Sequence, residues 1–271
     1  MPWTFAHPAA VLWLRERPAG PLSLAGLVAG SIAPDAGYYV QSFDLAALAH
    51  TPLGLVTVCP PIGLVLVAIF RAMHRPLAML LPQPHRRALL SLPRGPSMAS
   101  PAALASILLS VIIGALTHIL WDSFTHKSGT AVECLPLLQQ PVFTAIGEEF
   151  HVYNLLQHGS TVLGVAIIAV AYRRRLHRLP VRSSVSILRD EAWRYALLAA
   201  MGVVSAGVAG GLAVCAPGAA LDEAHFLGLV FRVVVDSTSV FAVLLAAVAL
   251  LAARLTPPAL RSAAEGRRER D

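Results

Sequence analysis

The chain has 271 residues, of which 56% are hydrophobic and only 13% are charged, and its formal net charge is +6. Soluble domains carry about twice that share of charged residues. The composition therefore excludes a soluble protein and predicts an all-α, polytopic transmembrane helix bundle.

The N-terminal part of the chain predicts a short helical hairpin. Its two apolar stretches, Met1–Leu14 and Leu22–Ala33, are both shorter than the ~20 residues that a complete crossing needs. The segment Pro18–Pro21 must interrupt a helix between them. Such a hairpin brings His7 and Asp35 to the same end. No cleavable signal peptide is expected, because no basic residues precede the first apolar stretch.

Five longer apolar stretches each predict a transmembrane helix. They are Pro52–Phe70, Pro101–Trp121, Leu155–Tyr172, Trp193–Ala216 and Phe226–Ala253. Adjacent prolines at positions 60 and 61 predict a kink near the middle of the first helix. Residues 71–100 and 122–154 are expected to be loops. Residues 1–255 should form a single membrane-embedded domain, and residues 256–271 a disordered tail.

Basic residues are confined to one set of connecting segments. Segments 15–17, 71–100, 173–194 and 254–271 hold 19 of the 21 Lys and Arg residues, whereas segments 34–51, 122–154 and 217–225 hold only Lys127. By the positive-inside rule, the first set faces the cytoplasm and the second set faces outward. The chain is therefore expected in the inner (cytoplasmic) membrane with a cytoplasmic C-terminus. Its basic character reflects topology and not nucleic-acid binding.

Three polar residues spaced four apart, His118, Asp122 and His126, close the second long stretch. On a helix they share one face, and each step rises about 6 Å, so the two histidines would lie roughly 12 Å apart. One metal ion can therefore take only a neighbouring pair, most simply His118 with Asp122. His126 then needs a second ion, a bend in the chain or a different role.

Polar residues from five separate segments fall at or near the outward ends of their elements. They are His7, Asp35, His50, His118, Asp122, His126 and His158. Ionisable groups at membrane depth are costly and tend to mark function. Imidazole with carboxylate suits Zn²⁺, or Mn²⁺ and Fe²⁺ where carboxylates dominate. The alternative is that each of these side chains contacts headgroups and water on its own.

Five motifs are spread over this part of the chain. They are Thr4-Phe5-Ala6-His7-Pro8, Gly30-Ser31-Ile32-Ala33-Pro34-Asp35, His50-Thr51-Pro52-Leu53-Gly54, Thr117-His118-x-x-Trp121-Asp122-x-x-Thr125-His126 and Gln157-His158-Gly159-Ser160. Together they resemble an uncharacterised bacterial membrane family, the domain-of-unknown-function family four-one-eight-four, over about residues 1–255. That family is in turn distantly similar to the membrane-bound metal-dependent hydrolases and to zinc-dependent phospholipase C.

The resemblance implies a set of metal ligands. Carried over residue by residue, the set is His7, Asp35, His50, His118 and Asp122. The chain departs from the hydrolases at the third motif, where their double-histidine signature is reduced to His50-Thr51.

These observations predict a membrane-embedded metal-dependent hydrolase that opens outward. A bound divalent ion, Zn²⁺ before Mn²⁺ or Fe²⁺, would lower the pKa of bound water and polarise a phosphoryl or acyl oxygen. His126 or His158 would move protons. A lipid or headgroup phosphoester is the expected substrate, because the site is expected at headgroup depth in the lipid bilayer.

The alternative is a non-enzymatic membrane protein, with either a structural metal site or a carrier function. A carrier would use Arg232 and Asp236, which lie four residues apart inside the last long stretch. The simpler interpretation of this pair is a buried ion pair that fixes helix packing. As a functional site, Arg232 would hold a phosphate or carboxylate.

Overall fold

The structure is a computed structural model that describes residues 3–16, 22–93, 98–145, 147–179, 186–215 and 223–255. These residues are mostly helical, with a single two-stranded antiparallel sheet among them. Five of the described helices are long and apolar enough to cross a membrane. The predicted polytopic helix bundle is therefore confirmed, and the chain is a multi-pass membrane protein. The expected C-terminal tail, residues 256–271, lies outside the described residues.

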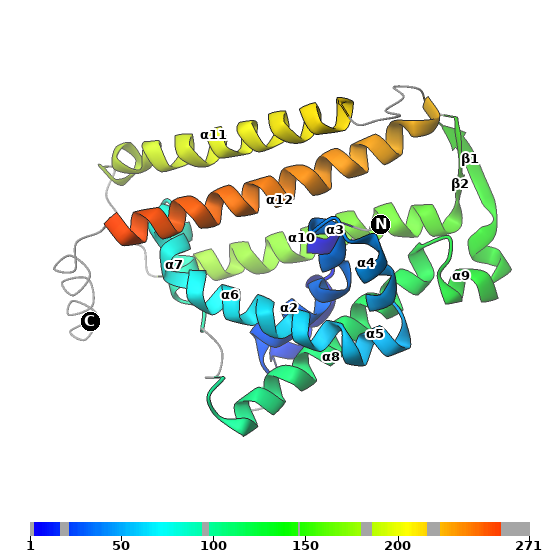
Figure 1. Ribbon diagram of the computed structural model, residues 1–271, viewed down its shortest axis with the longest axis horizontal. Coiled ribbons are helices and arrows are strands. Elements are labelled where there is room, and N and C mark those ends of the chain that lie inside the picture. The colour runs from blue at the N-terminus through cyan, green and yellow to red at the C-terminus, as the bar shows by residue number, and fades with distance from the viewer. Residues whose placement is uncertain are drawn as a thin grey trace.

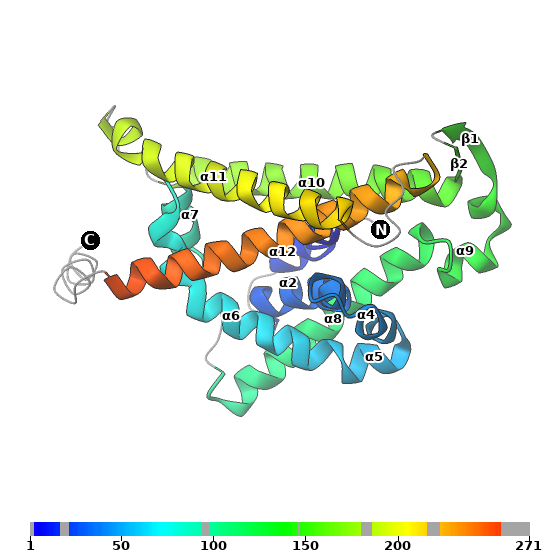
Figure 2. The ribbon, with the colours of Figure 1, turned by 45° about the horizontal axis from the view of Figure 1, so that its top comes forward.

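The five long helices lie roughly along one direction of the molecule (Figure 1). They are α6 (Cys59–Leu80), α8 (Pro101–Thr125), α10 (Val152–Arg178), α11 (Ser186–Val214) and α12 (Glu223–Leu255). Helices α11 and α12 pack side by side, and α12 also packs against α6 (Figure 2). Helix α10 packs instead against α8 and the N-terminal segment. The bundle therefore has two sides, with α11 and α12 on one and α10 on the other.

The N-terminal segment contains only short helical pieces, as its length predicts. They are η1 (Thr4–Ala6), α1 (Ala9–Leu12), η2 (Trp13–Glu16) and α2 (Leu24–Ile32). Ser23 directly precedes helix α2. Its hydroxyl accepts a hydrogen bond from the Gly26 amide and so caps the helix. The turn of the expected hairpin, residues 17–21, lies outside the described residues.

The first long helix begins later than the sequence predicts. The expected span Pro52–Phe70 is divided into a short helix α5 (Pro52–Thr57) and α6, which starts at Cys59. Proline lacks the amide hydrogen that a helix interior requires, but the first turn does not need it. Pro60 and Pro61 therefore occupy the first turn of α6 and do not kink its middle. Helix α6 then continues through Arg71 to Leu80, where a loop was expected.

The other long helices also run further than their apolar cores. Helix α8 extends to Thr125, so Asp122 lies in its last turn and not in a loop. The expected loop 71–100 contains the short helix α7 (His85–Leu90). The expected loop 122–154 contains α9 (Thr130–Cys134), η4 (Pro136–Gln139), and the hairpin strands β1 (Pro141–Ala145) and β2 (Glu148–His151). Helix α9 and the hairpin lie at one end of the bundle and α7 near the other (Figure 1).

Helices α2 and α8 cross at very short range, and this crossing builds the site. A Cβ atom on Gly114 would lie 2.2 Å from the Leu27 carbonyl oxygen, and one on Gly30 would lie 2.1 Å from the Val111 carbonyl oxygen. Small residues at such positions let two backbones approach closely. A core of Ala29, Val67, Ile107 and Val111 fills the space between α2, α6 and α8. The end of α2 is thereby fixed against the face of α8 that carries His118.

Three short helical elements connect α2 to α5. They are η3 (Ala33–Asp35), α3 (Ala36–Tyr39) and α4 (Phe43–Ala49). The buried residues Ala33, Ala49, Cys59 and Ala115 pack together and join these elements to α6 and α8. Asp35 and His50 are therefore held beside α8, although they lie far from it in the sequence.

Candidate metal centre

Four ligand-type side chains from three segments converge at the last two turns of α8. Asp35 ends η3, His50 follows α4, and His118 and Asp122 lie on α8. One potential ligand atom from each lies within 4.8 Å of the other three. The i, i+4 spacing on α8 brings His118 Nε2 to 3.2 Å from Asp122 Oδ2, as the sequence predicts. The structure thus brings together four of the five residues predicted as ligands in one group.

The three other nitrogen-to-oxygen distances within this group are similar to one another. Asp35 Oδ1 lies 3.4 Å from His118 Nε2 and 3.5 Å from His50 Nε2, and His50 Nε2 lies 3.5 Å from Asp122 Oδ2. Nitrogen and oxygen ligands lie about 2.0–2.2 Å from Zn²⁺ in tetrahedral sites, which corresponds to ligand-to-ligand distances of roughly 3–4 Å. Two imidazole nitrogens and two carboxylate oxygens therefore have the spacing of one small coordination sphere.

Backbone carbonyl groups fix the orientation of both imidazole rings. His118 Nδ1 lies 2.8 Å from the Ser31 carbonyl oxygen, and His50 Nδ1 lies 2.7 Å from the Ala46 carbonyl oxygen. A carbonyl oxygen can only accept, so each Nδ1 is the protonated, donating nitrogen. In the neutral ring Nε2 then carries the lone pair. Histidine ligands commonly have this second hydrogen bond, which orients the ring.

The centre contains buried polar atoms that are not satisfied by the protein. His118 Nε2, Asp35 Oδ1, Asp122 Oδ1 and His7 Nε2 are buried and form no hydrogen bond to any residue that the structure describes. His118 and Asp35 have no exposed surface, and buried polar atoms without partners are costly. A divalent cation would satisfy lone pairs and carboxylate charges that face one another. The residues therefore fit a Zn²⁺-type ion.

Protonation can also balance these charges, and burial and neighbouring charges shift the pKa values of the groups that lie outside the transmembrane helices. Burial alone would lower the pKa of His50, but Asp122 and Asp35 raise it to about 9. Burial alone would raise the pKa of the Asp35 carboxyl, but His118, His50 and the Thr4 hydroxyl hold it well below its usual range. Without a metal, His50 thus takes up a proton to balance the two carboxylates.

His7 lies beside the four-residue group and packs on it. Its ring stacks on the His118 ring with a centroid distance of 3.8 Å, and its Nε2 lies 3.5 Å from Asp122 Oδ1. Burial and the charge of His118 lower the pKa of His7 to about 3, so its ring is neutral. The short N-terminal pieces therefore bring His7 to the predicted place, on the opposite oxygen of Asp122 from His50 and His118.

The chain matches a known protein family over almost its whole length. A protein family described as Domain of unknown function (DUF4184) matches residues 1–254. The chain belongs to this family. The match includes all five motifs, so the predicted resemblance is confirmed and the candidate centre lies inside the DUF4184 region. Nothing among the curated proteins or the solved structures matches the chain.

His126 also reaches Asp122, which the helical spacing alone did not predict. Helix α8 of the DUF4184 region ends at Thr125, and His126 has an extended backbone conformation. Its ring folds back so that Nδ1 lies 3.5 Å from Asp122 Oδ1 and 3.1 Å from the Asp122 carbonyl oxygen. The expected separation of roughly 12 Å from His118 assumed that the helix continued. Asp122 is therefore shared by four histidines.

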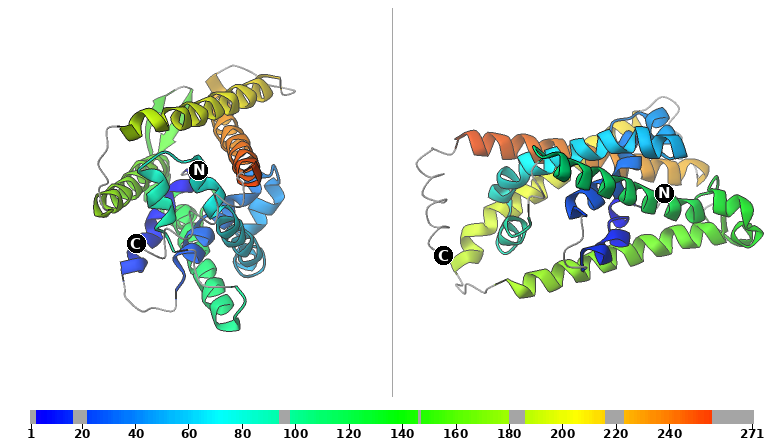
Figure 3. Two further views of the ribbon diagram at one scale, coloured as in Figure 1. Left: turned by 90° about the vertical axis from the view of Figure 1, so that its left-hand side faces the viewer. Right: turned by 90° about the horizontal axis from the view of Figure 1, so that it is seen from below.

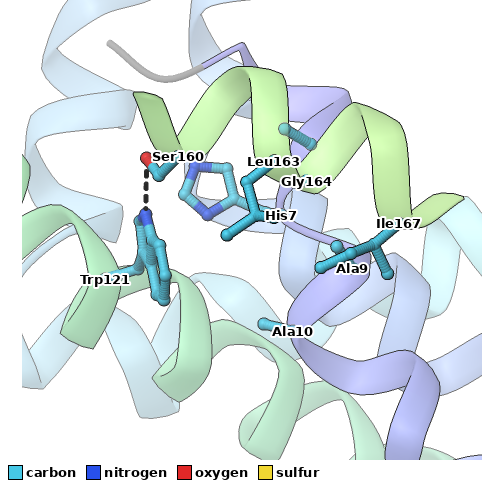
Figure 4. A pocket seen from close by; sticks show the side chains of 9 residues that line it. His7, Ala9, Ala10, Trp121, Ser160, Leu163, Gly164 and Ile167 are labelled. Atoms are coloured by element: carbon cyan, nitrogen blue, oxygen red, sulfur yellow. Dashed lines mark hydrogen bonds between the residues drawn. The ribbon is translucent and has the colours of Figure 1, made fainter. Parts of the chain in front are cut away.

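A small cavity of about 120 Å³ borders His7, and neither Asp35 nor His50 is among its lining residues (Figure 4). Ala9 and Ala10 of α1 and Leu163 and Ile167 of α10 contribute apolar side chains to its wall. At its edge the Trp121 indole donates a hydrogen bond of 3.0 Å to the Ser160 hydroxyl, which links α8 to α10 (Figure 4). Trp121, Ser160 and His7 therefore line the same cavity.

The other predicted residues lie away from the centre. His158 is exposed on α10, where its ring lies 6.3 Å from that of Phe150. Arg232 is exposed on α12, and Asp236 accepts a hydrogen bond of 2.7 Å from the Gln41 amide. The expectation of a buried Arg232–Asp236 pair is therefore wrong, because Arg232 lies at an exposed position of α12 and Asp236 is bonded to Gln41.

Sequence reasoning missed several residues that support the centre. The Thr4 hydroxyl donates a 2.6 Å hydrogen bond to Asp35 Oδ2, and Thr4 is buried. The Tyr38 ring lies 6.4 Å from the His50 ring. The carbonyl groups of Ser31 and Ala46 orient the histidines, as described above. Thr4 was present in the first motif beside His7, and that was the one signal for it in the sequence.

Proposed function

We propose that this membrane protein is a metal-dependent hydrolase whose ion is held by Asp35, His50, His118 and Asp122. The observation that carries the proposal is the arrangement of the two imidazoles. Each donates Nδ1–H to a backbone carbonyl, and each directs Nε2 at the same two carboxylates, 3.2–3.5 Å away. Such an arrangement is typical of a metal site and is unfavourable without a cation.

A divalent cation in this place supplies an acidic bound water and polarises a phosphoryl or acyl oxygen. The protein contributes the groups around it. The side chains of His50 and His126 are 23% and 24% exposed, so the centre is reachable from one side. His126 lies against Asp122 Oδ1 and is placed to take or give a proton at Nδ1. His7 remains neutral and contributes packing and a polar contact to Asp122.

The proposed substrate is a phosphoester of a membrane lipid or its headgroup. The centre lies at the end of α8, in a helix long and apolar enough to cross a membrane, and this end of the bundle carries few basic residues. We place this end on the outer face of the inner membrane, with the C-terminus in the cytoplasm. A site at this depth meets headgroups before it meets any soluble molecule.

Of the two non-enzymatic alternatives, the carrier is not supported by the positions of Arg232 and Asp236. Arg232 is exposed and Asp236 is bound to Gln41, so the two residues do not form a buried site in the bundle. A structural metal site remains the other possibility. Partial exposure of His50 and His126 favours the enzyme, because a catalytic ion needs a side on which water or substrate can reach it.

The test is hydrolysis of dioleoyl phospholipids in vesicles by the purified full-length chain. We expect released phosphorylated headgroup or phosphate, loss of activity with a chelator, and recovery with added Zn²⁺. His50→Gln should abolish this activity, because it removes a ligand nitrogen. His85→Gln is the matched control, since His85 is only partly buried and its Nδ1 lies 2.5 Å from the Tyr172 hydroxyl, on α7 and away from the centre. Metal bound by the wild type without any hydrolysis would favour the structural site.

A further inference from the structure

A large cavity of about 810 Å³ adjoins the candidate metal centre. Its wall includes Thr4, which donates to Asp35, and Tyr38, whose ring lies near that of His50. Cavities of about 300–1,000 Å³ are typical of sites for small-molecule ligands. We call this cavity the chamber. Its position means that a molecule bound in it would contact residues next to the metal ligands.

The chamber has one apolar wall and one polar wall. Val230, Phe231 and Val234 of α12 form the apolar wall, and the two valines are each 42% exposed. The opposite wall comes from the β-hairpin and the start of α10 and carries the polar side chains of Glu149 and Gln157 as well as the rings of Phe150 and Tyr153. An occupant that matches both walls must itself have a polar part and an apolar part. A phospholipid has this character, whereas a free phosphoester has only the polar part.

Gln157 is a polar residue of this wall, and it is only 8% exposed. Its backbone carbonyl accepts hydrogen bonds from the hydroxyls of Ser160 and Thr161. Its side-chain amide forms no hydrogen bond to another described residue and is not among the fully enclosed polar atoms that lack one. A polar group in the chamber could therefore hydrogen-bond to this amide in place of water. Gln157 is therefore positioned to recognise the polar part of an occupant.

The two helices that form the opposite walls belong to different parts of the bundle. Helix α12 packs against α11, α6 and α3, whereas α10 packs against α8, η1 and α1. Seen along the bundle and from below, α10 and α12 lie apart (Figure 3). Both are long and apolar enough to cross a membrane. The chamber thus lies between two helices that are long and apolar enough to cross a membrane.

We propose that the chamber binds one bilayer phospholipid, with its headgroup against Gln157 and its acyl chains along the Val230–Val234 face of α12. The choice of a phosphoester rests on the hydrolase proposed above, but binding itself does not require hydrolysis. In this arrangement the headgroup lies beside Thr4 and Tyr38, next to the metal ligands. Gln157 then determines the affinity for the headgroup. The apolar face of α12 favours a molecule that has acyl chains over a soluble molecule that lacks them.

The test measures binding of dioleoyl phosphatidylethanolamine by native mass spectrometry of the full-length chain, as purified and after chelator treatment. We expect one lipid per chain for the wild type. Val234→Trp fills the chamber and should weaken binding at least about tenfold, whereas Val243→Trp on the exposed face of the same helix should not. Gln157→Leu should weaken binding about fivefold, the value of one hydrogen bond.

Soluble glycerophosphoethanolamine distinguishes the lipid from a free headgroup. It should compete at least about tenfold more weakly than the lipid, because it lacks the chains that the apolar wall would bury. Equal binding of the lipid by the wild type and by both chamber variants would overturn the proposal, as would equal competition by the soluble compound. Lipid binding without hydrolysis would instead count against the proposed enzyme and leave the chamber assignment standing.

Discussion

Asp122 Oδ1 and His7 Nε2 lie 3.5 Å apart, although 114 positions separate the two residues in the sequence. The other oxygen of Asp122 faces His50 and His118. This carboxylate therefore joins the N-terminal segment, the connection between α4 and α5, and the end of α8. A change that disturbs any of these three segments should affect the same centre.

The buried hydroxyl of Thr4 should contribute to metal affinity without binding the metal. It donates to Asp35 Oδ2 and so holds the carboxylate in place. Residues that support ligands in this way typically change metal affinity by about 10–100-fold. We expect Thr4→Val to weaken Zn²⁺ binding within that range in a chelator competition assay. Thr57→Val is the control, because Thr57 is exposed and bonds only within its own helix. Equal affinity in the two variants would contradict the role of Thr4.

The close crossing of α2 and α8 should be sensitive to a single added methyl group. Gly114→Ala would place a Cβ 2.2 Å from the Leu27 carbonyl oxygen, so α2 must move and the contact between Ser31 and His118 must lengthen. Overpacking of this kind costs about 1–3 kcal/mol. We expect a lower thermal unfolding temperature and weaker Zn²⁺ binding.

Gly159→Ala provides the matched control for this crossing. A Cβ at Gly159 on α10 meets no atom within 4 Å, so the variant should unfold at or above the wild-type temperature. If Gly114→Ala behaved in the same way, the α2–α8 crossing would not be the element that positions His118.

Metal affinity should rise with pH because a proton competes for His50. The pKa of His50 in the metal-free protein is raised to about 9, so the ring carries a proton at neutral pH. Metal binding requires the neutral ring and releases that proton. Apparent affinity for Zn²⁺ should therefore fall by at least about tenfold per pH unit as the pH drops below about 9. Titration calorimetry in buffers of different ionisation enthalpy should detect the released proton, and a pH-independent affinity would contradict this assignment.

The orientation in the membrane is tested by reporters fused after Asp271. Because 19 of the 21 Lys and Arg residues lie in the segments assigned to the cytoplasm, a fluorescent protein fused there should fold and alkaline phosphatase should be inactive. An active phosphatase fusion would invert the topology and place the metal centre on the cytoplasmic side.

The sequence predicted the parts of the structure that depend on local patterns. Apolar stretches of sufficient length predicted the five long helices. The four-residue spacing of His118 and Asp122 predicted that both lie on one helical face. The break between α5 and α6 was missed, because Pro60 and Pro61 fit a first turn as well as a kink. A bend at His126 was one of three alternatives left open by the sequence, because a periodic pattern does not specify where α8 ends.

Contacts between segments distant in sequence were harder to predict. The motifs marked His7, Asp35 and His50, but the bond from Thr4 to Asp35 and the carbonyl contacts of Ser31 and Ala46 depend on how α2 and α4 meet α8. The Arg232–Asp236 spacing gave a false prediction, since i, i+4 spacing says nothing about which face of α12 is covered.

The central claim is that Asp35, His50, His118 and Asp122 hold one metal ion, and metal analysis of the purified chain tests it most directly. We predict about one Zn²⁺ or similar ion per chain, with an X-ray absorption spectrum showing nitrogen and oxygen ligands at about 2.0–2.2 Å. Asp122→Asn should lose the ion, and Asp44→Asn, at an exposed position, should retain it. A wild-type chain grown with ample zinc that holds no ion, or an Asp122→Asn chain that holds as much as the wild type, would contradict the account.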